Sequence, residues 1–241
     1  MIDVAFLGTD VRAAGTAVVI DVLRATSTIT LALASGYERV LVAGGIDEAS
    51  ALRTAQRTLA GEVRCARAPG FDLGNSPEET LAPRTPELVL ATTNGAPAIV
   101  GCAAVAGEVL AASLLNLDAV LAQLAGADDI LLVAAGTDGR VSIEDVYLAG
   151  RLSAALEGPR SDAARIAEAV AASYDSPLAA LEASAGAIGL RREGLESDIA
   201  FCAQESIVDA VARLTSTVGG VAVMERAESP APAGIASPGL T

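Results

Sequence analysis

Residues 16–28, Thr16-Ala17-Val18-Val19-Ile20-Asp21-Val22-Leu23-Arg24-Ala25-Thr26-Ser27-Thr28, contain an apolar run that stops at a carboxylate and gives way to a helical pattern. The same change recurs where Leu88-Val89-Leu90 precedes Thr92-Thr93-Asn94-Gly95, and where Ile130-Leu131-Leu132-Val133 precedes Gly136-Thr137, with Glu144-Asp145 just beyond. In open α/β sheets, ligands bind in the crevice outside the strand ends that precede helices. We therefore expect these polar groups to meet in one crevice, suited to a metal ion and an anionic substrate.

Strand and helix patterns alternate along the chain, which is typical of an α/β protein. Strand patterns cover 3–6, 16–20, 39–42, a short stretch near Val63, 87–91, 108–111, 129–133 and 218–224. Helical patterns cover 26–35, 47–59, 97–105, 118–124, 143–156, 162–172 and 178–186. The prediction is a three-layer α/β/α fold with a mostly parallel or mixed sheet and a helix-rich C-terminal half.

The predicted domain organisation is a single domain over residues 1–227, with two lobes, 1–157 and 158–227, as the alternative. Residues 66–86 lack periodicity and are rich in Pro, Gly, Asn and Glu, so we expect a long loop, a feature that is often functional. Residues 228–241 are rich in Pro, Ala and Ser, and this composition predicts a disordered tail.

The composition excludes several classes of chemistry. The chain contains no histidine, and all of its Lys and Arg residues are arginine. These absences exclude Ser-His-Asp triads, His-ligated zinc, Schiff-base lysines and the lysine of nucleotide P-loops. Catalysis must rely on acids, arginine, hydroxyls, thiols, backbone groups or a metal held by oxygen. Oxygen ligands favour Mg²⁺, or Mn²⁺, over softer metals.

The charge and hydropathy patterns limit the partners. A net charge of −14 argues against nucleic acid, which requires a basic face. No apolar run approaches the roughly twenty residues of a membrane span, and the N-terminus lacks a signal-peptide pattern, so we expect a cytoplasmic protein. The three cysteines are far apart in sequence, which indicates neither zinc nor disulfides. A homodimer is the default expectation for a cytosolic enzyme.

Each polar cluster has a functional and a structural explanation. Asp21 and Arg24 could serve a metal and a phosphate, with the hydroxyls of Thr26 and Ser27 at a helix start that attracts anions. The structural alternative is an Asp21–Arg24 ion pair with a Ser or Thr N-cap, and the spacing fits both equally. At residues 92–97, Asn94 as a cap explains part of the pattern. The adjacent threonines and Gly95 favour an anion site.

The remaining acids and amides are less specific. The pattern Ser142-Ile143-Glu144-Asp145 has the form of a capping box, so a structural role is favoured on that segment alone. Asn75 and Ser76 lie on the predicted long loop, where Ser76 also suits a helix start. Asp198 is a lone acid, which by itself indicates a surface or capping residue.

Four segments in order resemble the 2-phosphosulfolactate phosphatase (ComB) family over nearly the whole chain to Met224. They are Val19-Ile20-Asp21-Val22-Leu23-Arg24-Ala25-Thr26-Ser27-Thr28, Gly70-Phe71-Asp72-Leu73-Gly74-Asn75-Ser76-Pro77, Thr92-Thr93-Asn94-Gly95 and Glu144-Asp145-Val146-Tyr147-Leu148-Ala149-Gly150. The resemblance implies an α/β/α fold and Mg²⁺-dependent hydrolysis of 2-phosphosulfolactate to sulfolactate and phosphate, a step of coenzyme M synthesis. The matching positions are Asp21, Arg24, Asn75, Ser76, Thr92, Thr93, Asn94, Gly95, Gly136, Glu144, Asp145 and Asp198.

The roles expected at these positions follow from side-chain chemistry. Catalysis is assigned to Asp21, Arg24, Glu144 and Asp145, and the metal to Asp21, Glu144, Asp145 and Asp198. Substrate binding is assigned to Arg24, Thr26, Ser27, Asn75, Ser76, Thr92, Thr93, Asn94, Gly95, Gly136 and Thr137. Asp21 acts either as a nucleophile or through a water molecule, and Arg67 or Arg140 is a candidate for a second anion clamp.

The chain departs from the family pattern at two places. Ala134 stands before Ala135-Gly136 where family members often have cysteine, and Ala183-Ser184-Ala185-Gly186 is the nearest match to a Ser-x-His-Gly element. These departures motivate a rival hypothesis, in which the protein is a non-catalytic binder of an anionic metabolite on the same fold.

Overall fold

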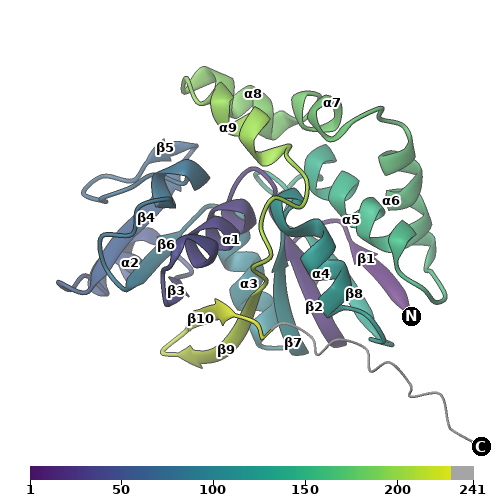
Figure 1. Ribbon diagram of the computed structural model, residues 1–241, viewed down its shortest axis with the longest axis horizontal. Helices are drawn as coiled ribbons and strands as arrows, with labels where there is room; N and C mark the ends of the chain where they lie inside the picture. Colours follow the sequence, from purple (N-terminus) through teal and green to yellow (C-terminus); the bar gives the residue numbers. More distant parts are fainter. Residues whose placement is uncertain (229–241) are drawn as a thin grey trace, which may run out of the picture.

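A computed structural model describes residues 1–228 and shows a mixed sheet of ten strands in the order β1-β8-β2-β7-β9-β10-β3-β6-β4-β5 (Figure 1). The strands are β1 (Ile2–Ala5), β2 (Ala14–Ile20), β3 (Arg39–Val42), β4 (Arg57–Val63), β5 (Ala66–Arg67), β6 (Glu87–Ala91), β7 (Ala106–Ala112), β8 (Ile130–Ala134), β9 (Ala212–Val218) and β10 (Val221–Arg226). The helices are α1 (Ala25–Ser35), α2 (Ile46–Ala51), α3 (Gly95–Ala103), α4 (Leu117–Gln123), α5 (Ile143–Ala155), α6 (Asp162–Ala172), α7 (Pro177–Glu182), α8 (Ala185–Arg192) and α9 (Glu196–Cys202), with short 3₁₀ turns η1 (Pro77–Thr80) and η2 (Leu114–Asn116).

The sheet consists of two parallel blocks. Strands β1, β8, β2 and β7 pair in parallel, as do β3, β6 and β4. The antiparallel hairpin β9–β10 joins the blocks, pairing with β7 on one side and with β3 on the other. Followed through these pairings, the second block runs opposite to the first, so the carboxyl ends of β2 and β6 do not lie on one edge of a single parallel sheet. They approach because α3, which follows β6, packs against β2 and β7.

Alternating side chains of the strands pack into hydrophobic clusters on both faces of the sheet, and a third cluster lies where β3, β4, β6 and β10 meet α2. Val18 and Ile20 of β2 pack in the core that α4, α5 and α6 cover, together with residues of α7 to α9. Ala17 and Val19 pack in the core of the other face, with residues of α1 and α3. This arrangement confirms the predicted three-layer α/β/α fold.

Two predicted elements were wrong. The helix predicted over 47–59 ends at Ala51, and residues 57–63 form strand β4. Leu59 and Ala60 are buried beside β6, so sheet pairing overrides the helical pattern of this stretch. The single strand predicted over 218–224 is the turn and second strand of a hairpin, because Gly219 and Gly220 both adopt positive φ. Helices α8 and α9 were not predicted as separate elements.

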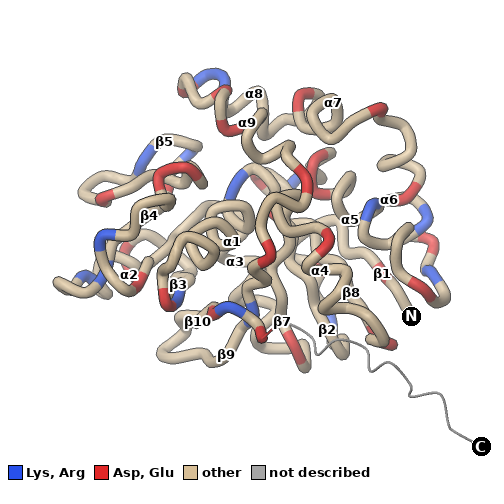
Figure 2. The backbone as a smooth tube through the Cα atoms, in the orientation of Figure 1, with Lys and Arg blue, Asp and Glu red and all other residues tan. Residues whose placement is uncertain are grey.

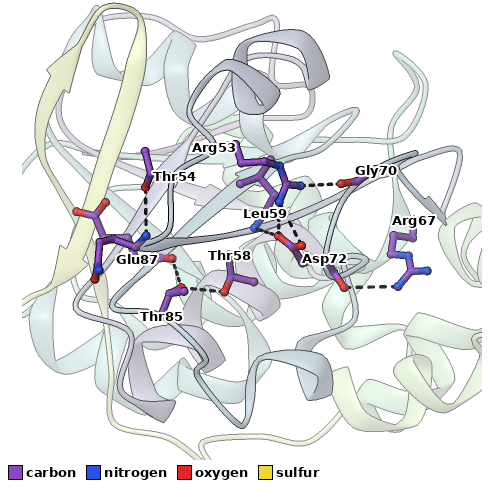
Figure 3. A network of polar contacts seen from close by, with 10 residues as sticks. Arg53, Thr54, Thr58, Leu59, Arg67, Gly70, Asp72, Thr85 and Glu87 are labelled. Carbon is purple, nitrogen blue, oxygen red and sulfur yellow. Dashed lines mark hydrogen bonds and ion pairs between the residues drawn. The ribbon is translucent and has the colours of Figure 1, made fainter.

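The predicted loop over 66–86 contains β5 and η1 and is fixed to the sheet by Asp72. Figure 3 shows its carboxylate accepting from the N–H of Leu59 at 2.8 Å and lying 3.2 Å from the Arg53 guanidinium. Arg53 also donates to the carbonyl oxygen of Gly70 at 2.6 Å. These contacts place the segment that carries Asn75 and Ser76.

Basic positions are spread over several elements among acidic ones rather than gathered along one element (Figure 2). Within residues 1–228, no helix has the length and apolar character needed to cross a membrane. All three cysteines are free thiols, and Cys65 is only half-buried. The predicted tail, 228–241, lies outside the described residues except for its first position, and the choice between one domain and two lobes stays a prediction.

Candidate active site

Asp21 follows directly after β2 and is buried, with 6% of its surface exposed. Its main chain is braced by Thr26, whose hydroxyl donates to the Asp21 carbonyl oxygen at 2.8 Å. Gly95 begins α3 directly against this carboxylate, because a Cβ added there would lie 2.5 Å from Oδ2 of Asp21. Burial raises the pKa of Asp21 to about 6, although the N–H of Ala25 lowers it and nearby Glu62 adds to the rise. A carboxylate held this way favours a nearby positive charge.

Glu144, in the first turn of α5, is the second buried acid of the site, and it is only 1% exposed. Burial raises its pKa to about 7, and the negative charge of Asp21 contributes. The hydroxyls of Ser184 and Ser142 oppose this rise. Its Oε2 atom is buried without a hydrogen-bond partner. Because buried polar atoms normally have partners, this orphaned oxygen indicates a missing donor or cation.

Asp145 ties two strand ends together. Its Oδ1 accepts from the N–H of Val22 at 2.9 Å, and its Oδ2 accepts from the N–H of Gly136 at 3.0 Å. Burial raises its pKa well above the ordinary value, with Glu144 and Asp21 adding to the rise. The capping box considered for this helix start does not form, since Ser142 makes no side-chain cap. Asp145 therefore fixes the segments after β2 and β8.

Arg24 does not pair with Asp21. Its Nη1 donates to Oδ2 of Asp198 at 2.7 Å, and its Nη2 donates to the carbonyl oxygen of Cys65 at 2.9 Å. Oδ1 of Asp198 accepts from the hydroxyl of Ser76 at 2.6 Å. The expectation that Asp198 is a surface or capping residue was wrong, because it is 1% exposed. An acid from α9 is thereby joined to the segment before α1.

Several backbone donors expected to face an anion already have acceptors in the protein. The N–H of Thr93 donates to Oε1 of Glu62 at 2.7 Å, and the N–H of Asp138 donates to Oδ1 of Asn94 at 3.1 Å. Asn94 does not cap α3 with its side chain; instead the N–H of Ala96 donates to Oγ1 of Thr92 at 3.0 Å. The segments after β6 and β8 are thus in contact with each other.

The remaining predicted substrate-binding residues have mixed surroundings. Thr26 and Ser27 are fully buried, and their hydroxyls donate to the carbonyl oxygens of Asp21 and Val22, which gives them a structural role. Oδ1 of Asn75 is buried without a partner. The hydroxyl of Thr137 lies 2.7 Å from that of Ser142. Their roles toward a substrate stay predictions.

A pocket of about 170 Å³ lies beside this cluster, lined by Glu62, Thr92 and Thr93 together with residues 44–46. Glu62, at the end of β4, was missed by the sequence analysis. It is buried, and its carboxylate accepts from the N–H groups of Thr93 and Cys65. The short strand predicted near Val63 lies at the end of β4, but it was not linked to the other strand ends, and Glu62 beside it was overlooked.

Ser184 and Gly186 were also not assigned to the site. They lie close to Glu144: the Ser184 hydroxyl lowers the pKa of its carboxyl, and a Cβ added at Gly186 would lie 2.4 Å from its Oε1. The resemblance at Ala183-Ser184-Ala185-Gly186 was the signal that could have found them. The short residues let α8 approach the acid closely.

The acids fit a Mg²⁺ site only in part. Among residues 1–228, no three His, Cys, Asp or Glu side chains are grouped so that they could hold a metal by themselves. Both carboxylate oxygens of Asp145 and of Asp198 accept hydrogen bonds from protein donors, whereas Oε2 of Glu144 has no hydrogen-bond partner. Mg²⁺ usually takes one or two protein carboxylates plus water and substrate oxygens. Asp21 and Glu144 are the pair that suits this ion.

Comparisons with known proteins show the family of this chain. The profile of the 2-phosphosulpholactate phosphatase family matches residues 6–217. A protein of Thermus thermophilus named "Probable 2-phosphosulfolactate phosphatase" is 39% identical, over 87% of this chain and 92% of its own. A protein of the same name from Thermotoga petrophila is 41% identical, over 84% of this chain and 90% of its own.

These matches put the chain among the phosphoric monoester hydrolases. Within that class, the chain belongs to the 2-phosphosulpholactate phosphatase family, because the match covers most of its length. The order of motifs along the chain, their convergence around Asp21 and the family match agree.

Proposed function

We propose that the protein is a Mg²⁺-dependent phosphatase that hydrolyses 2-phosphosulfolactate to 3-sulfolactate and phosphate. The observation that carries the proposal is the buried pair Asp21 and Glu144, whose member Asp21 is also influenced by the charge of Arg24. Two like charges in low dielectric require a proton or a cation to neutralise them, and the free Oε2 of Glu144 supports a cation by offering it a ligand. The names of the relatives supply the substrate.

In this mechanism, Asp21 and Glu144 would hold the ion, for which Mn²⁺ is an alternative. The chemistry supplied by bound Mg²⁺ is polarisation of a phosphoryl oxygen and stabilisation of the leaving oxygen. Arg24 uses the guanidinium N–H groups not engaged by Asp198 and Cys65 to bind the phosphoryl oxygens, since arginine has five donors. Asp145 keeps the backbone under the substrate in place.

Asp21 acts on phosphorus by one of two routes. Its carboxylate forms an aspartyl-phosphate, or it takes a proton from an attacking water. Reduction with borohydride during turnover separates the routes, because only the covalent intermediate is trapped at Asp21. A modified Asp21 supports the first route, and an unmodified residue supports the second.

The test of the proposal is phosphate release from 2-phosphosulfolactate with Mg²⁺, with EDTA, and in Asp21→Asn. We expect activity with Mg²⁺ and a loss of about 100-fold or more in the other two conditions. Glu196→Gln, an exposed acid on α9, is the matched control and should retain full activity. Hydrolysis that is indifferent to EDTA and to Asp21→Asn contradicts the metal mechanism.

The same experiment decides the rival function. A non-catalytic binder of an anionic metabolite would show a higher melting temperature with phosphate or sulfolactate and no hydrolysis. The feature that favours this rival is the segment Ala183-Ser184-Ala185-Gly186, which lies against Glu144 and lacks the histidine of the Ser-x-His-Gly element. A coenzyme M role, a cytoplasmic location and a homodimer stay predictions that the phosphatase assay does not address.

A further inference from the structure

The guanidinium of Arg24 is held by contacts from two distant parts of the chain. Asp198 of α9 accepts from its Nη1 at 2.7 Å, and the carbonyl oxygen of Cys65, just after β4, accepts from its Nη2 at 2.9 Å. The side chains of Arg24 and Asp198 are each 2% exposed. A buried guanidinium with this pair of acceptors cannot rotate freely, so its remaining N–H groups point in a fixed direction.

Asp198 itself has no oxygen left without a donor. Its Oδ2 accepts from Arg24 and its Oδ1 accepts from the hydroxyl of Ser76 at 2.6 Å. Ser76 lies on the 66–86 segment that Asp72 fixes to β4. The carboxylate is therefore oriented from both sides, and its charge is already neutralised by Arg24. These contacts suit a carboxylate that orients an arginine better than one that binds a metal.

We propose that Asp198, oriented by Ser76, is a positioning residue that aims Arg24 at the phosphoryl group and is not a metal ligand. The proposal rests on the proposed phosphatase function for what Arg24 binds. It assigns the C-terminal helices a part in the site: α9 in Figure 1 lies across one end of the sheet, and it delivers Asp198 to the start of α1.

The first experiment compares wild type, Asp198→Asn, Ser76→Ala and the control Glu196→Gln in the phosphatase assay. Loss of an outer partner of a functional group typically lowers activity by about 10- to 100-fold. We expect a loss in that range in kcat/KM for Asp198→Asn, a smaller loss for Ser76→Ala, and no change for Glu196→Gln. The Mg²⁺ concentration for half-maximal activity should be unchanged in all of them. A rise of tenfold or more in Asp198→Asn overturns the proposal in favour of a metal ligand.

Chemical rescue separates positioning from general structural damage. In Arg24→Ala, added guanidinium should restore part of the activity, because Asp198 and the Cys65 carbonyl still form its binding site. In Arg24→Ala with Asp198→Asn, the same additive should restore none. Equal rescue of both variants overturns the proposal. Should Asp198→Asn fail to fold, Ser76→Ala takes its place in the first experiment, since it removes only one hydroxyl, and an unchanged kcat/KM in Ser76→Ala then overturns the proposal.

Phosphate binding distinguishes failure of this inference from failure of the proposed function. If wild type does not hydrolyse 2-phosphosulfolactate, the proposed phosphatase function is wrong. Titration with inorganic phosphate then tests the positioning role of Asp198 alone. Asp198→Asn should then bind phosphate at least tenfold more weakly than wild type and Glu196→Gln. Equal affinity in the three proteins, or no binding to wild type, overturns the inference.

Discussion

Two pairs of buried charges lie close together in this protein, and they are resolved in opposite ways. Arg24 and Asp198 have opposite signs and form an ion pair with 2.7 Å between Nη1 and Oδ2. Asp21 and Glu144 have the same sign, and burial raises the pKa of Asp21 to about 6 and that of Glu144 to about 7. The first pair is neutral within the chain, whereas the second requires a proton or a metal ion from outside.

The two pairs differ in how their charge is neutralised, and this difference has a consequence for stability. Removing one partner of a buried ion pair strongly destabilises the folded protein, because the other charge is left buried without compensation. A like-charged pair is relieved when one charge is removed, and it is retained only where it serves a ligand. Substitutions in the two pairs should therefore change stability in opposite directions.

The largest effect on stability is expected for Arg24→Met. The substitution leaves Asp198 as an uncompensated buried charge, which lowers the free energy of unfolding by about 3–5 kcal/mol. The matched control is Arg226→Met, whose partner Asp209 is 86% exposed and whose loss should change stability by less than about 1 kcal/mol. Urea unfolding at pH 7 measures both. Similar losses in the two variants would show that burial of the Arg24 pair is unimportant.

The second prediction is a pH-dependent gain in stability for metal-free Asp21→Asn. The folded pKa of Asp21, about 6, exceeds its ordinary value of 3.8, so the folded state binds more protons between these values. In wild type, Asp21 therefore contributes a loss of stability as pH rises from about 4 to 6, and this contribution is absent in the asparagine variant. The two pKa values differ by about two units, so the difference at pH 7 is on the order of 3 kcal/mol.

Urea unfolding in EDTA at pH 4.5 and pH 7.5 measures this difference. The gain of Asp21→Asn over wild type should be small at the lower pH and near its full size at the higher pH. A gain in stability that is equal at both pH values, or a loss at pH 7.5, contradicts the raised pKa of Asp21.

The third prediction concerns the ion. Mg²⁺ at about 100 times its dissociation constant should stabilise wild type by about 2.7 kcal/mol through mass action. Glu144→Gln removes a ligand and relieves the like charge, so it should be more stable without metal and gain little from Mg²⁺. Melting temperatures with Mg²⁺ and with EDTA measure the effect. A Mg²⁺ shift that survives in Glu144→Gln places the ion elsewhere.

The smallest change in stability is expected for Gly186→Ala. The added Cβ would lie 2.4 Å from Oε1 of Glu144, and a flexible side chain can give way. Alanine favours the helix by up to about 1 kcal/mol, which offsets the displacement. Activity and the Mg²⁺ shift should fall while the melting temperature stays within a few degrees. Gly189→Ala, which meets Cys65 at 3.2 Å, is the control for the helix and should keep its activity.

Much of the fold was predictable because it depends on local pattern. The run from Ala17 to Ile20 is apolar on both sides of a strand, and it is buried on both sides in the structure. The same reasoning located most strands and α5 within a few residues. It failed at β4, where residues 57–59 have a helical pattern but pair with β6. The pairing of a strand with another strand that is distant in sequence produces no periodic pattern in either segment.

The proximity of Asp21, Gly95 and Glu144 was predictable, since each follows or begins an element whose position the α/β pattern constrains. The contacts of Arg24 were not predictable. Spacing fitted an Asp21–Arg24 ion pair and an anion-binding role equally. The actual partner of Arg24 is 174 residues away, and no local pattern identifies such a residue.

By itself, the sequence determined the alternation of strands and helices, the absence of histidine and lysine chemistry, and the acids available at strand ends. Only the tertiary structure decided which acids have both oxygens hydrogen-bonded within the protein, as Asp145 and Asp198 do, and which have an oxygen without a partner, as Glu144 does. The physical reason is that chain composition and periodicity fix burial, whereas the partner of a buried charge depends on which distant segments the sheet brings within hydrogen-bonding distance.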